Sequence, residues 1–343
     1  MKRQVLIHQN IRSVEVIEEE CPLPKDNEVL IQTRYSGISA GTESLIYRGL
    51  FPENLLLDET LSSLSGEFSY PFRYGYCCVG KIIECGKQVD RKWLGVRVFA
   101  FYPHCSYFTS PLSDLLPLPE ILRDEDAVFI PNMETAVNLL QDGRPILGES
   151  VAVFGLGMVG LLTTALLGQF PLGFLGCLDL HPHRRQIAFH LGADVALNPL
   201  ELWQSGSLRE AFISAGLPQS GADLIYELSG SPAALNQAIE LCGFNSRIVV
   251  GSWYGKKSVP LDLGGLFHRN RISIISSQVS TISPALSGRW DKSRRFQVVF
   301  EQLENIKPGN WISHYVPLTE ADQFFDRLVD SQSEILQAVF TYS

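Results

Sequence analysis

The sequence predicts an α/β protein with two domains, one rich in β-strands and one built on a doubly wound parallel sheet. Three observations lead to this prediction. Short β-like runs fill the chain to about residue 119, strands alternate with helices from about residue 134, and a glycine-rich turn opens the alternating part. With 343 residues, the chain is long enough for two domains that each have a core.

The strands of the first part are short runs rich in β-branched and aromatic residues, with turns between them. The clearest are Val14–Ile17, Glu28–Gln32, Val79–Ile83 and Arg97–Phe101. A longer segment, Phe51–Tyr70, separates two of these strands and contains a predicted helical piece, Asp58–Leu64. Two interpretations of this segment stay open, a surface excursion and a lid or wall over a substrate.

The second part contains six strand-like runs alternating with helical runs, the number that a complete nucleotide-binding sheet requires. The strands are predicted over Val151–Phe154, Phe174–Leu178, Val195–Leu197, Ala222–Tyr226, Arg247–Val250 and Ile272–Ser277. The helices are predicted over Leu161–Leu167, Pro182–Leu191, Ser207–Ala215 and Pro232–Leu241. Beyond this sheet we expect two more helices and a last strand, over Lys292–Leu303, Glu320–Val329 and Ala338–Thr341.

The segment Val151–Asp179 predicts a dinucleotide site of the Rossmann type. Four apolar residues lead into a G-x-G-x-x-G motif, a helical run follows, and the second strand ends on an acidic residue. Gly155 permits the tight turn, Gly157 lets the backbone approach a pyrophosphate, and Gly160 lets helix and strand pack closely. The N-terminus of the helix adds unpaired N–H groups that attract phosphate.

The residues expected to bind the cofactor are Gly155, Leu156, Gly157, Met158, Val159, Gly160, Asp179, Arg184 and Ser229. A carboxylate at the end of the second strand accepts hydrogen bonds from ribose hydroxyls and repels a 2′-phosphate, so Asp179 favours NAD over NADP. His181, Arg184 and Arg185 either soften this preference or form a solvated helix start. NAD is therefore the predicted cofactor, and NADP is the alternative.

Composition and charge exclude several classes of function. The net charge of −9 argues against nucleic acid or an anionic membrane as the main partner. No window approaches 18 unbroken apolar residues and no secretory signal is apparent, so we expect a cytoplasmic protein that acts on a small molecule. The seven cysteines have no C-x-x-C spacing, which indicates reduced thiols.

Three motifs give the chain a family resemblance. They are Tyr35-Ser-Gly-Ile-Ser-Ala-Gly-Thr-Glu43, Gly75-Tyr-Cys-Cys-Val-Gly80 and Ile312-Ser-His-Tyr-Val-Pro-Leu318. Together with a Rossmann segment between the second and the third motif, they resemble the medium-chain dehydrogenase/reductase superfamily over essentially the whole chain. The first motif is similar to that of the bacteriochlorophyllide hydroxyethyl dehydrogenase branch. The resemblance implies a GroES-like catalytic domain over residues 1–125, completed by 285–343, and a Rossmann domain over residues 126–284.

The chain departs from the zinc-dependent members at their metal ligands. Ser39 or Ala40 stands at the position of a thiolate ligand, Tyr76 at that of an imidazole, and Cys77 at that of a carboxylate. Neutral hydroxyls are poor zinc ligands, and the four-cysteine structural lobe is missing. A makeshift site from Cys77, His104, Cys105 and Glu134 is conceivable, but nothing in their spacing demands it. We therefore expect an enzyme without zinc.

Without a metal, a side chain must donate or accept the proton of the reacting hydroxyl. The candidates are Ser39, Thr42, Glu43, Tyr76, His104 and Glu134. Ser39 and Thr42 suit hydrogen bonding to the substrate oxygen, and Tyr76 could donate to a carbonyl or form a wall. Glu43 is a base or an acid that binds backbone amides, and His104 is a catalytic or a satisfied loop histidine. Glu134 is an alternative proton carrier or serves a helix N-terminus.

The resemblance implies hydride transfer between a nicotinamide and a CH–OH/C=O group of a fairly large organic substrate. Two alternatives stay open, an NADPH-dependent reductase of activated C=C bonds and an inactive dinucleotide-binding protein. The cationic segment Arg289–Arg295 either binds an acidic substrate or is a solvated helix face. The apolar run Ile272–Ser276 is expected to be an edge strand that pairs across a homodimer axis.

Overall fold

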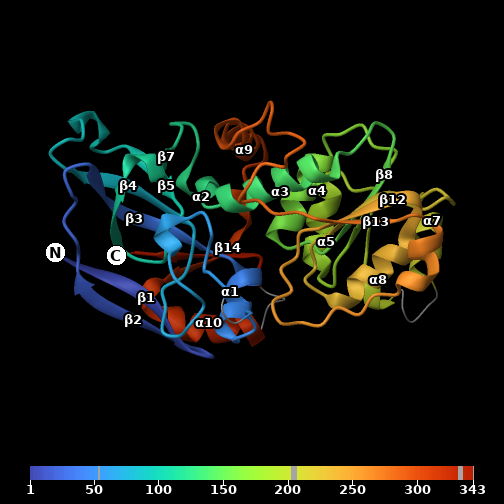
Figure 1. Ribbon diagram of the computed structural model, residues 1–343, viewed down its shortest axis with the longest axis horizontal. Helices are drawn as coiled ribbons and strands as arrows, with labels where there is room; N and C mark the ends of the chain where they lie inside the picture. Colours follow the sequence, from blue (N-terminus) through green and yellow to red (C-terminus); the bar gives the residue numbers. More distant parts are fainter. Residues whose placement is uncertain (53–54, 202–206, 331–334, 343) are drawn as a thin grey trace. The chain divides into compact units, whose positions relative to one another are not determined.

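The computed structural model describes residues 1–52, 55–201, 207–330 and 335–342, and the chain divides into two compact units (Figure 1). Unit 1 comprises Met1–Pro131 and Leu303–Ser343, and unit 2 comprises Asn132–Gln302. The predicted boundaries follow residues 125 and 284. Both observed boundaries, after Pro131 and after Gln302, lie later in the chain. The second lies later because helix α9 (Lys292–Ile306) begins within unit 2, where Lys292 binds Glu134.

Unit 1 contains two β-sheets, as the β-like runs of the first part predict. Strands β1 (Lys2–Asn10) and β2 (Ser13–Glu20) form an antiparallel pair. The larger sheet has the order β14-β15-β3-β4-β5-β7, and β6 (Tyr107–Pro111) also pairs with β3. Its other strands are β3 (Glu28–Ile38), β4 (Cys78–Cys85), β5 (Arg97–Ala100), β7 (Leu115–Pro117), β14 (Ile312–Pro317) and β15 (Gln337–Thr341). The C-terminal strand β15 therefore lies against β3, as Figure 1 shows.

The helices of unit 1 are few and short, which is typical of a β-rich domain. They are α1 (Ala40–Tyr47), α2 (Asp124–Ala127) and α10 (Ala321–Asp330). Short 3₁₀ segments are η1 (Ser62–Leu64), η2 (Arg91–Trp93), η3 (Leu112–Asp114), η5 (Pro308–Trp311) and η6 (Leu318–Glu320). The core of the unit consists of buried side chains between the sheets and α10, among them Leu6, Val29, Phe325 and Phe340.

The predicted helical piece Asp58–Leu64 is wrong, because only Ser62–Leu64 is helical and it is a single 3₁₀ turn. The Asp58 carboxylate accepts hydrogen bonds from the backbone N–H groups of Thr60 and Leu61. These bonds close a local turn at Asp58, and the backbone after it becomes helical only at Ser62. Residues 53 and 54 of the longer segment lie outside the described residues.

Unit 2 contains a parallel sheet with the order β10-β9-β8-β11-β12-β13, which confirms the predicted doubly wound fold. Its strands are β8 (Ser150–Phe154), β9 (Phe174–Leu178), β10 (Val195–Leu197), β11 (Ala222–Glu227), β12 (Cys242–Val250) and β13 (Ser273–Ser276). Its helices are α3 (Ile130–Gly143), α4 (Met158–Leu167), α5 (Pro182–His190), α7 (Leu208–Ser214), α8 (Pro232–Leu241) and the first part of α9. A π-helical turn, η4, spans Leu263–Phe267. Figure 1 shows α4 and α5 on one flank of the strands, and α7 and α8 on the other.

The strand order reverses between β8 and β11, because the chain winds outward from β8 in both directions. The sheet therefore has a switch point between β8 and β11, and in this fold ligands bind outside the carboxyl ends of the strands at such a point. No helix in the described part of the chain is long and apolar enough to cross a membrane. All seven cysteines are free thiols.

Candidate active site

The glycine turn after β8 has the geometry that the motif predicts. Gly155 has a φ of +91°, and a Cβ at Gly160 would lie 1.9 Å from the carbonyl oxygen of Gly155. A side chain at either position would therefore strain or separate the strand and the helix. A Cβ at Gly157, by contrast, would meet no atom within 4 Å. This open space lies at the N-terminus of α4, where backbone N–H groups are available to a pyrophosphate.

Asp179 stands at the end of β9, and its carboxylate is nearly buried. One carboxylate oxygen, Oδ2, accepts a hydrogen bond of 2.7 Å from the N–H of Leu156 in the glycine turn. The other, Oδ1, accepts one of 2.8 Å from the N–H of His181. Asp179 thus holds the turn as well as presenting a negative charge beside it, a role that the motif alone does not reveal.

Two arginines that follow Asp179 differ in their surroundings. The Arg185 guanidinium donates to the carbonyl oxygens of Asp179 and Leu180, so it holds the start of α5 together. Burial lowers the pKa of Arg184, and the charge of Asp179 opposes that shift. Arg185 is therefore a structural residue, while Arg184 lies within the electrostatic range of the carboxylate that faces the predicted ribose site.

Ser229, two residues beyond the neighbouring strand β11, packs against the glycine turn. A Cβ at Gly155 would lie 2.5 Å from the Cα of Ser229. Both the N–H and the hydroxyl of Ser229 donate to Oε1 of Glu227, which is fully buried. Tyr254 donates to the other oxygen of Glu227. Burial raises the pKa of Tyr254, and the negative charge of that carboxylate raises it further. Sequence reasoning found Ser229 but not Glu227 or Tyr254.

In unit 1, three of the predicted catalytic hydroxyls come together. Ser39 immediately precedes α1, Thr42 lies in its first turn, and Tyr76 precedes β4. Burial raises the pKa of Tyr76 to about 12, although hydrogen bonding from Ser39 and Thr42 opposes the shift. All three side chains are partly exposed. The cluster can therefore donate hydrogen bonds to a substrate oxygen, with the phenol protonated at neutral pH.

Behind these hydroxyls lies a buried pair, Glu43 and His104, both 0% exposed. Oε1 of Glu43 accepts a hydrogen bond of 2.7 Å from the N–H of Ser39. Oε2 lies 3.0 Å from Nε2 of His104, which makes this nitrogen the donor. One oxygen of Glu43 thus binds a backbone amide, as the structural interpretation predicts, and the other binds an imidazole, while the role of Glu43 as a base stays a prediction.

The network continues through two residues that sequence reasoning missed. Nδ1 of His104 lies 2.6 Å from the hydroxyl of Ser36, and that hydroxyl lies 2.6 Å from the hydroxyl of Tyr342. In the neutral imidazole, with Nε2 of His104 donating to Glu43, Nδ1 accepts from Ser36, and Ser36 in turn accepts from Tyr342. A signal for Ser36 was available in the first motif, Tyr35–Glu43. No sequence signal indicated Tyr342, because its hydroxyl enters the network only when β15 pairs with β3.

Glu134 and the cationic segment have structural partners within unit 2. Oε1 of Glu134 accepts from Lys292, and Arg295, which is fully buried, lies 3.5 Å from the same oxygen. Lys292 and Arg295 also donate to the carbonyl oxygen of Val279. Arg294 stacks over Trp290, with its guanidinium carbon 4.3 Å from the ring centroid. We therefore interpret Glu134 and this segment as parts of the scaffold.

The residues at the zinc positions do not fit a metal ion. The thiol of Cys77 is buried and donates to the carbonyl oxygen of Val128 at 3.0 Å, and burial raises its pKa to about 12. Both ring nitrogens of His104 are used by Glu43 and Ser36. Across the described residues, no three His, Cys, Asp or Glu side chains are grouped so that they could hold a metal.

Comparison with known proteins relates this geometry to dehydrogenases. The model of the zinc-binding dehydrogenase family matches residues 159–296. D-guloside 3-dehydrogenase of Escherichia coli K12 is 25% identical over an alignment of 362 positions, gaps included, which covers 97% of both chains. An alcohol dehydrogenase (rspB) from E. coli CFT073, solved with NADH, has a TM-score of 0.78 at 22% identity and 99% coverage of both chains. A zinc-binding dehydrogenase from Sinorhizobium meliloti 1021, bound to NADP, has a TM-score of 0.76 at 17% identity and the same coverage.

The family model falls on the unit with the glycine turn, and the similarity to the curated dehydrogenase extends over nearly the whole chain. The solved structures share the fold of both units. Over nearly its whole length the chain is therefore similar to medium-chain, alcohol dehydrogenase-like proteins, and residues 159–296 match the zinc-binding dehydrogenase family.

Proposed function

We propose that the protein uses NAD(H) to interconvert a secondary alcohol and a ketone without a catalytic zinc ion. One observation carries the proposal: the hydroxyls of Ser39, Thr42 and Tyr76 gather in front of the buried Glu43–His104 pair. In the metal-dependent relatives, zinc eases removal of the hydroxyl proton. Here polar side chains take that place.

The reaction divides between the cofactor and the side chains. A bound nicotinamide coenzyme would supply the hydride chemistry, as the acceptor of one proton and two electrons from the carbinol carbon. Ser39 and Thr42 orient the substrate oxygen, and Tyr76 donates a hydrogen bond to it when it is a carbonyl. In alcohol oxidation the hydroxyl proton leaves through this hydrogen-bonded cluster toward Glu43, which His104 holds in position. In ketone reduction the proton returns along the same path.

The choice of NAD rests on Asp179. Its carboxylate lies at the end of β9 and repels a 2′-phosphate, which argues against NADP. Arg184 is close enough to that carboxylate for the two charges to interact, so we expect a preference for NAD rather than exclusion of NADP. Titration of the protein with each coenzyme tests this expectation, and equal affinities for both would contradict it.

The substrate class follows from the polar character of the cluster and from the relative that acts on a guloside. We propose a polyhydroxylated or otherwise large organic alcohol. The test is a spectrophotometric panel of secondary alcohols, sugars and their ketones with NAD⁺ and NADH, together with metal analysis of untagged protein. Stoichiometric zinc would refute the metal-free mechanism, and activity confined to enones with NADPH would favour C=C reduction. Coenzyme binding without any turnover would indicate an inactive dinucleotide-binding protein.

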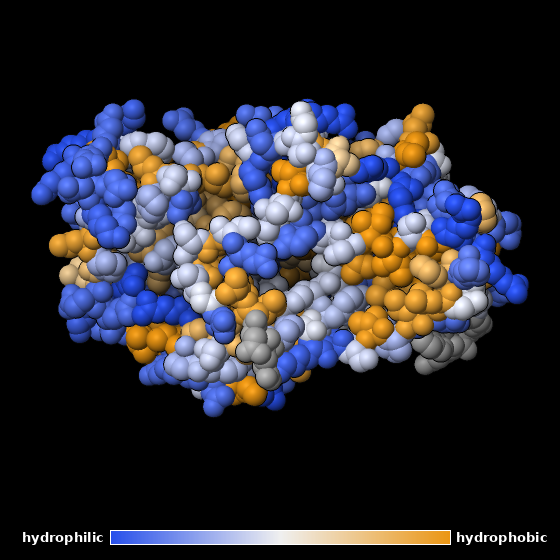
Figure 2. Space-filling view, viewed as in Figure 1, coloured by the Kyte–Doolittle hydropathy of each residue, from blue (hydrophilic) through white to orange (hydrophobic). Residues whose placement is uncertain are grey.

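We also propose that the protein is a homodimer through β13. This strand ends the sheet of unit 2, and only β12 pairs with it within the described chain. Figure 2 shows apolar side chains gathered over the region that Figure 1 labels β12, β13 and α8. Phe244, Leu263, Leu266 and Ile274 are exposed large hydrophobic residues of unit 2. An exposed apolar edge needs a cover, and a monomeric mass at micromolar concentration in light scattering would contradict this proposal.

A further inference from the structure

A small cavity in unit 1 lies apart from the residues assigned above. Its volume is about 230 Å³, and its lining residues are Arg3, Val5, Leu57, Ser63, Ser65, Arg73, Tyr102, Pro103 and Cys105. Two arginines line it and no acidic residue does. Binding pockets for whole cofactors or drug-sized ligands exceed about 300 Å³, so this cavity suits a small molecule or one functional group of a larger one.

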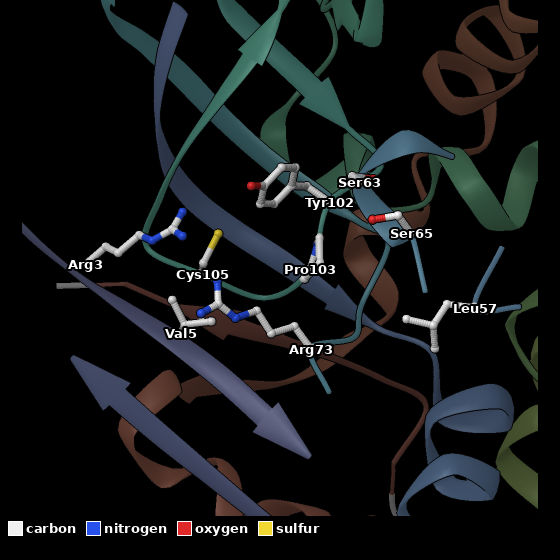
Figure 3. Close-up of a pocket in the computed structure, with 9 residues that line it drawn as sticks. All are labelled: Arg3, Val5, Leu57, Ser63, Ser65, Arg73, Tyr102, Pro103 and Cys105. Atoms are coloured by element: carbon white, nitrogen blue, oxygen red, sulfur yellow. The ribbon is translucent and has the colours of Figure 1, made fainter. Parts of the chain in front are cut away.

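The two arginines converge on the cavity from different parts of the chain. Figure 3 shows the guanidinium groups of Arg3 and Arg73 directed toward Cys105, with Ser63, Ser65 and Leu57 at the other end of the pocket. Arg3 is held firmly: only 8% of it is exposed, and it donates to Glu19 and to the carbonyl oxygen of Tyr107. Arg73 comes from the segment before Tyr76, and 41% of its side chain is exposed.

The charges around the cavity do not cancel. Glu19 accepts from both arginines, at 2.8 Å from Nε of Arg3 and at 2.7 Å from Arg73. Burial opposes ionisation of Glu19, but the two arginines lower its pKa below the usual value, so it stays a carboxylate. Two cations therefore share one anion. Among the described residues Glu19 is the only hydrogen-bond partner of Arg73, whose guanidinium has five N–H groups.

We propose that this cavity binds a small oxyanion, a carboxylate or a phosphate group, through the free edge of the Arg73 guanidinium. An arginine fork matches the paired oxygens of either group in two parallel hydrogen bonds. Arg3 supplies a second, fixed positive charge, and the hydroxyls of Ser65 and Tyr102 are further donors on the cavity wall. Pro103 and Cys105 form part of that wall, and His104, which lies between them in sequence, binds Glu43 instead.

The test is calorimetric titration of the full chain at constant ionic strength, with inorganic phosphate and with malonate as probes. We expect saturable binding of at least one probe, and the probe that binds identifies the group. Arg73→Gln should weaken that binding at least tenfold, and Arg73→Lys should weaken it less because the charge remains. Arg91→Gln is the matched control, since this exposed arginine of unit 1 lies outside the cavity lining.

Phosphate can also bind at the N-terminus of α4, but binding there does not depend on Arg73. Unchanged affinity in Arg73→Gln would therefore overturn the proposal, as would an equal loss in Arg91→Gln. Absence of saturation by both probes up to about 20 mM would also overturn it. None of these readouts uses turnover or a nicotinamide coenzyme, so the result is independent of the proposed dehydrogenase activity.

Discussion

The two units present polar groups in different ways. In unit 2 the candidate cofactor site consists mainly of backbone, with the N–H groups of a glycine turn held by Asp179 and packed against Ser229. In unit 1 the candidate proton-transfer site consists of side chains, with Glu43 and His104 buried behind three hydroxyls. A site made of backbone groups tolerates substitution at most of its positions but not the addition of a Cβ at certain glycines. A network of side chains, by contrast, fails when one member is removed. Substitutions in each unit should therefore fail in different ways.

The largest effect is expected from Glu43→Ala. The substitution leaves the N–H of Ser39 and Nε2 of His104 without their buried acceptor. We expect a loss of about 3–5 kcal/mol in the free energy of unfolding and a fall in kcat of about 10²-fold or more. Glu43→Gln is the control, because its amide oxygen can still accept from Ser39. Denaturant unfolding and kinetics measure both effects, and wild-type stability in Glu43→Ala would show that the buried network is unimportant.

His8 offers a contrast with His104 within unit 1. Both are fully buried, but in the described part of the chain neither ring nitrogen of His8 has a hydrogen-bond partner. Burial, with the nearby His104, lowers the pKa of His8 to about 3 from 6.5. Below pH 6.5 the unfolded chain therefore binds a proton at His8. The folded chain binds that proton only below about pH 3. Stability contributed by the neutral ring is complete above pH 6.5 and is lost as the pH falls toward 3.

His8→Phe keeps the stacking on Phe72, whose ring centroid lies 5.6 Å away, and removes the titrating group. We expect the variant to gain about 3 kcal/mol over the wild type between pH 7 and pH 4, at about 1.4 kcal/mol per pH unit. Urea unfolding at a series of pH values measures the difference. A constant difference across that range would mean that His8 is not the buried neutral ring described above.

Two glycine substitutions separate stability from cofactor binding in unit 2. Gly160→Ala places a Cβ 1.9 Å from the carbonyl oxygen of Gly155, so we expect a loss of about 1–3 kcal/mol in stability. Gly157→Ala meets no protein atom within 4 Å, and its φ of −67° suits alanine. It should fold normally but bind NAD at least tenfold more weakly, a loss of about 1.4 kcal/mol. Calorimetry with NAD checks this, and wild-type affinity in Gly157→Ala would place the pyrophosphate elsewhere.

The smallest effect is expected from Tyr342→Phe, which removes the last hydroxyl of the chain that leads from His104. Ser36 then loses one partner but keeps Nδ1 of His104. We expect a loss of about 1 kcal/mol in stability and a decrease of several-fold in kcat with KM unchanged, because Tyr342 positions His104 without touching the substrate. An increase in KM with unchanged kcat would instead assign Tyr342 to substrate binding.

Most of unit 2 could be predicted from the sequence because its signals are local. The strand at β8, the three glycines and Asp179 occur within a span of 30 residues, and most strands of the unit are followed directly by Gly, Asp, Asn or Ser. The zinc positions could be interpreted in the same way, since Tyr76 and Cys77 stand within one motif. The predicted helical piece at Asp58–Leu64 was wrong, because Asp58 closes a local turn and only Ser62–Leu64 is helical.

The sequence alone thus determined the doubly wound sheet and the glycine turn, because periodicity and one contiguous motif encode both, whereas the residues at the zinc positions follow from the family resemblance. Tertiary structure decided the partners: Glu43 with His104, Ser36 with Tyr342, and Glu134 with Lys292. These pairs join residues 61, 306 and 158 positions apart, so no local pattern specifies them. A buried polar group must find a hydrogen-bond partner, but which partner it finds depends on strands that meet only after the chain has folded.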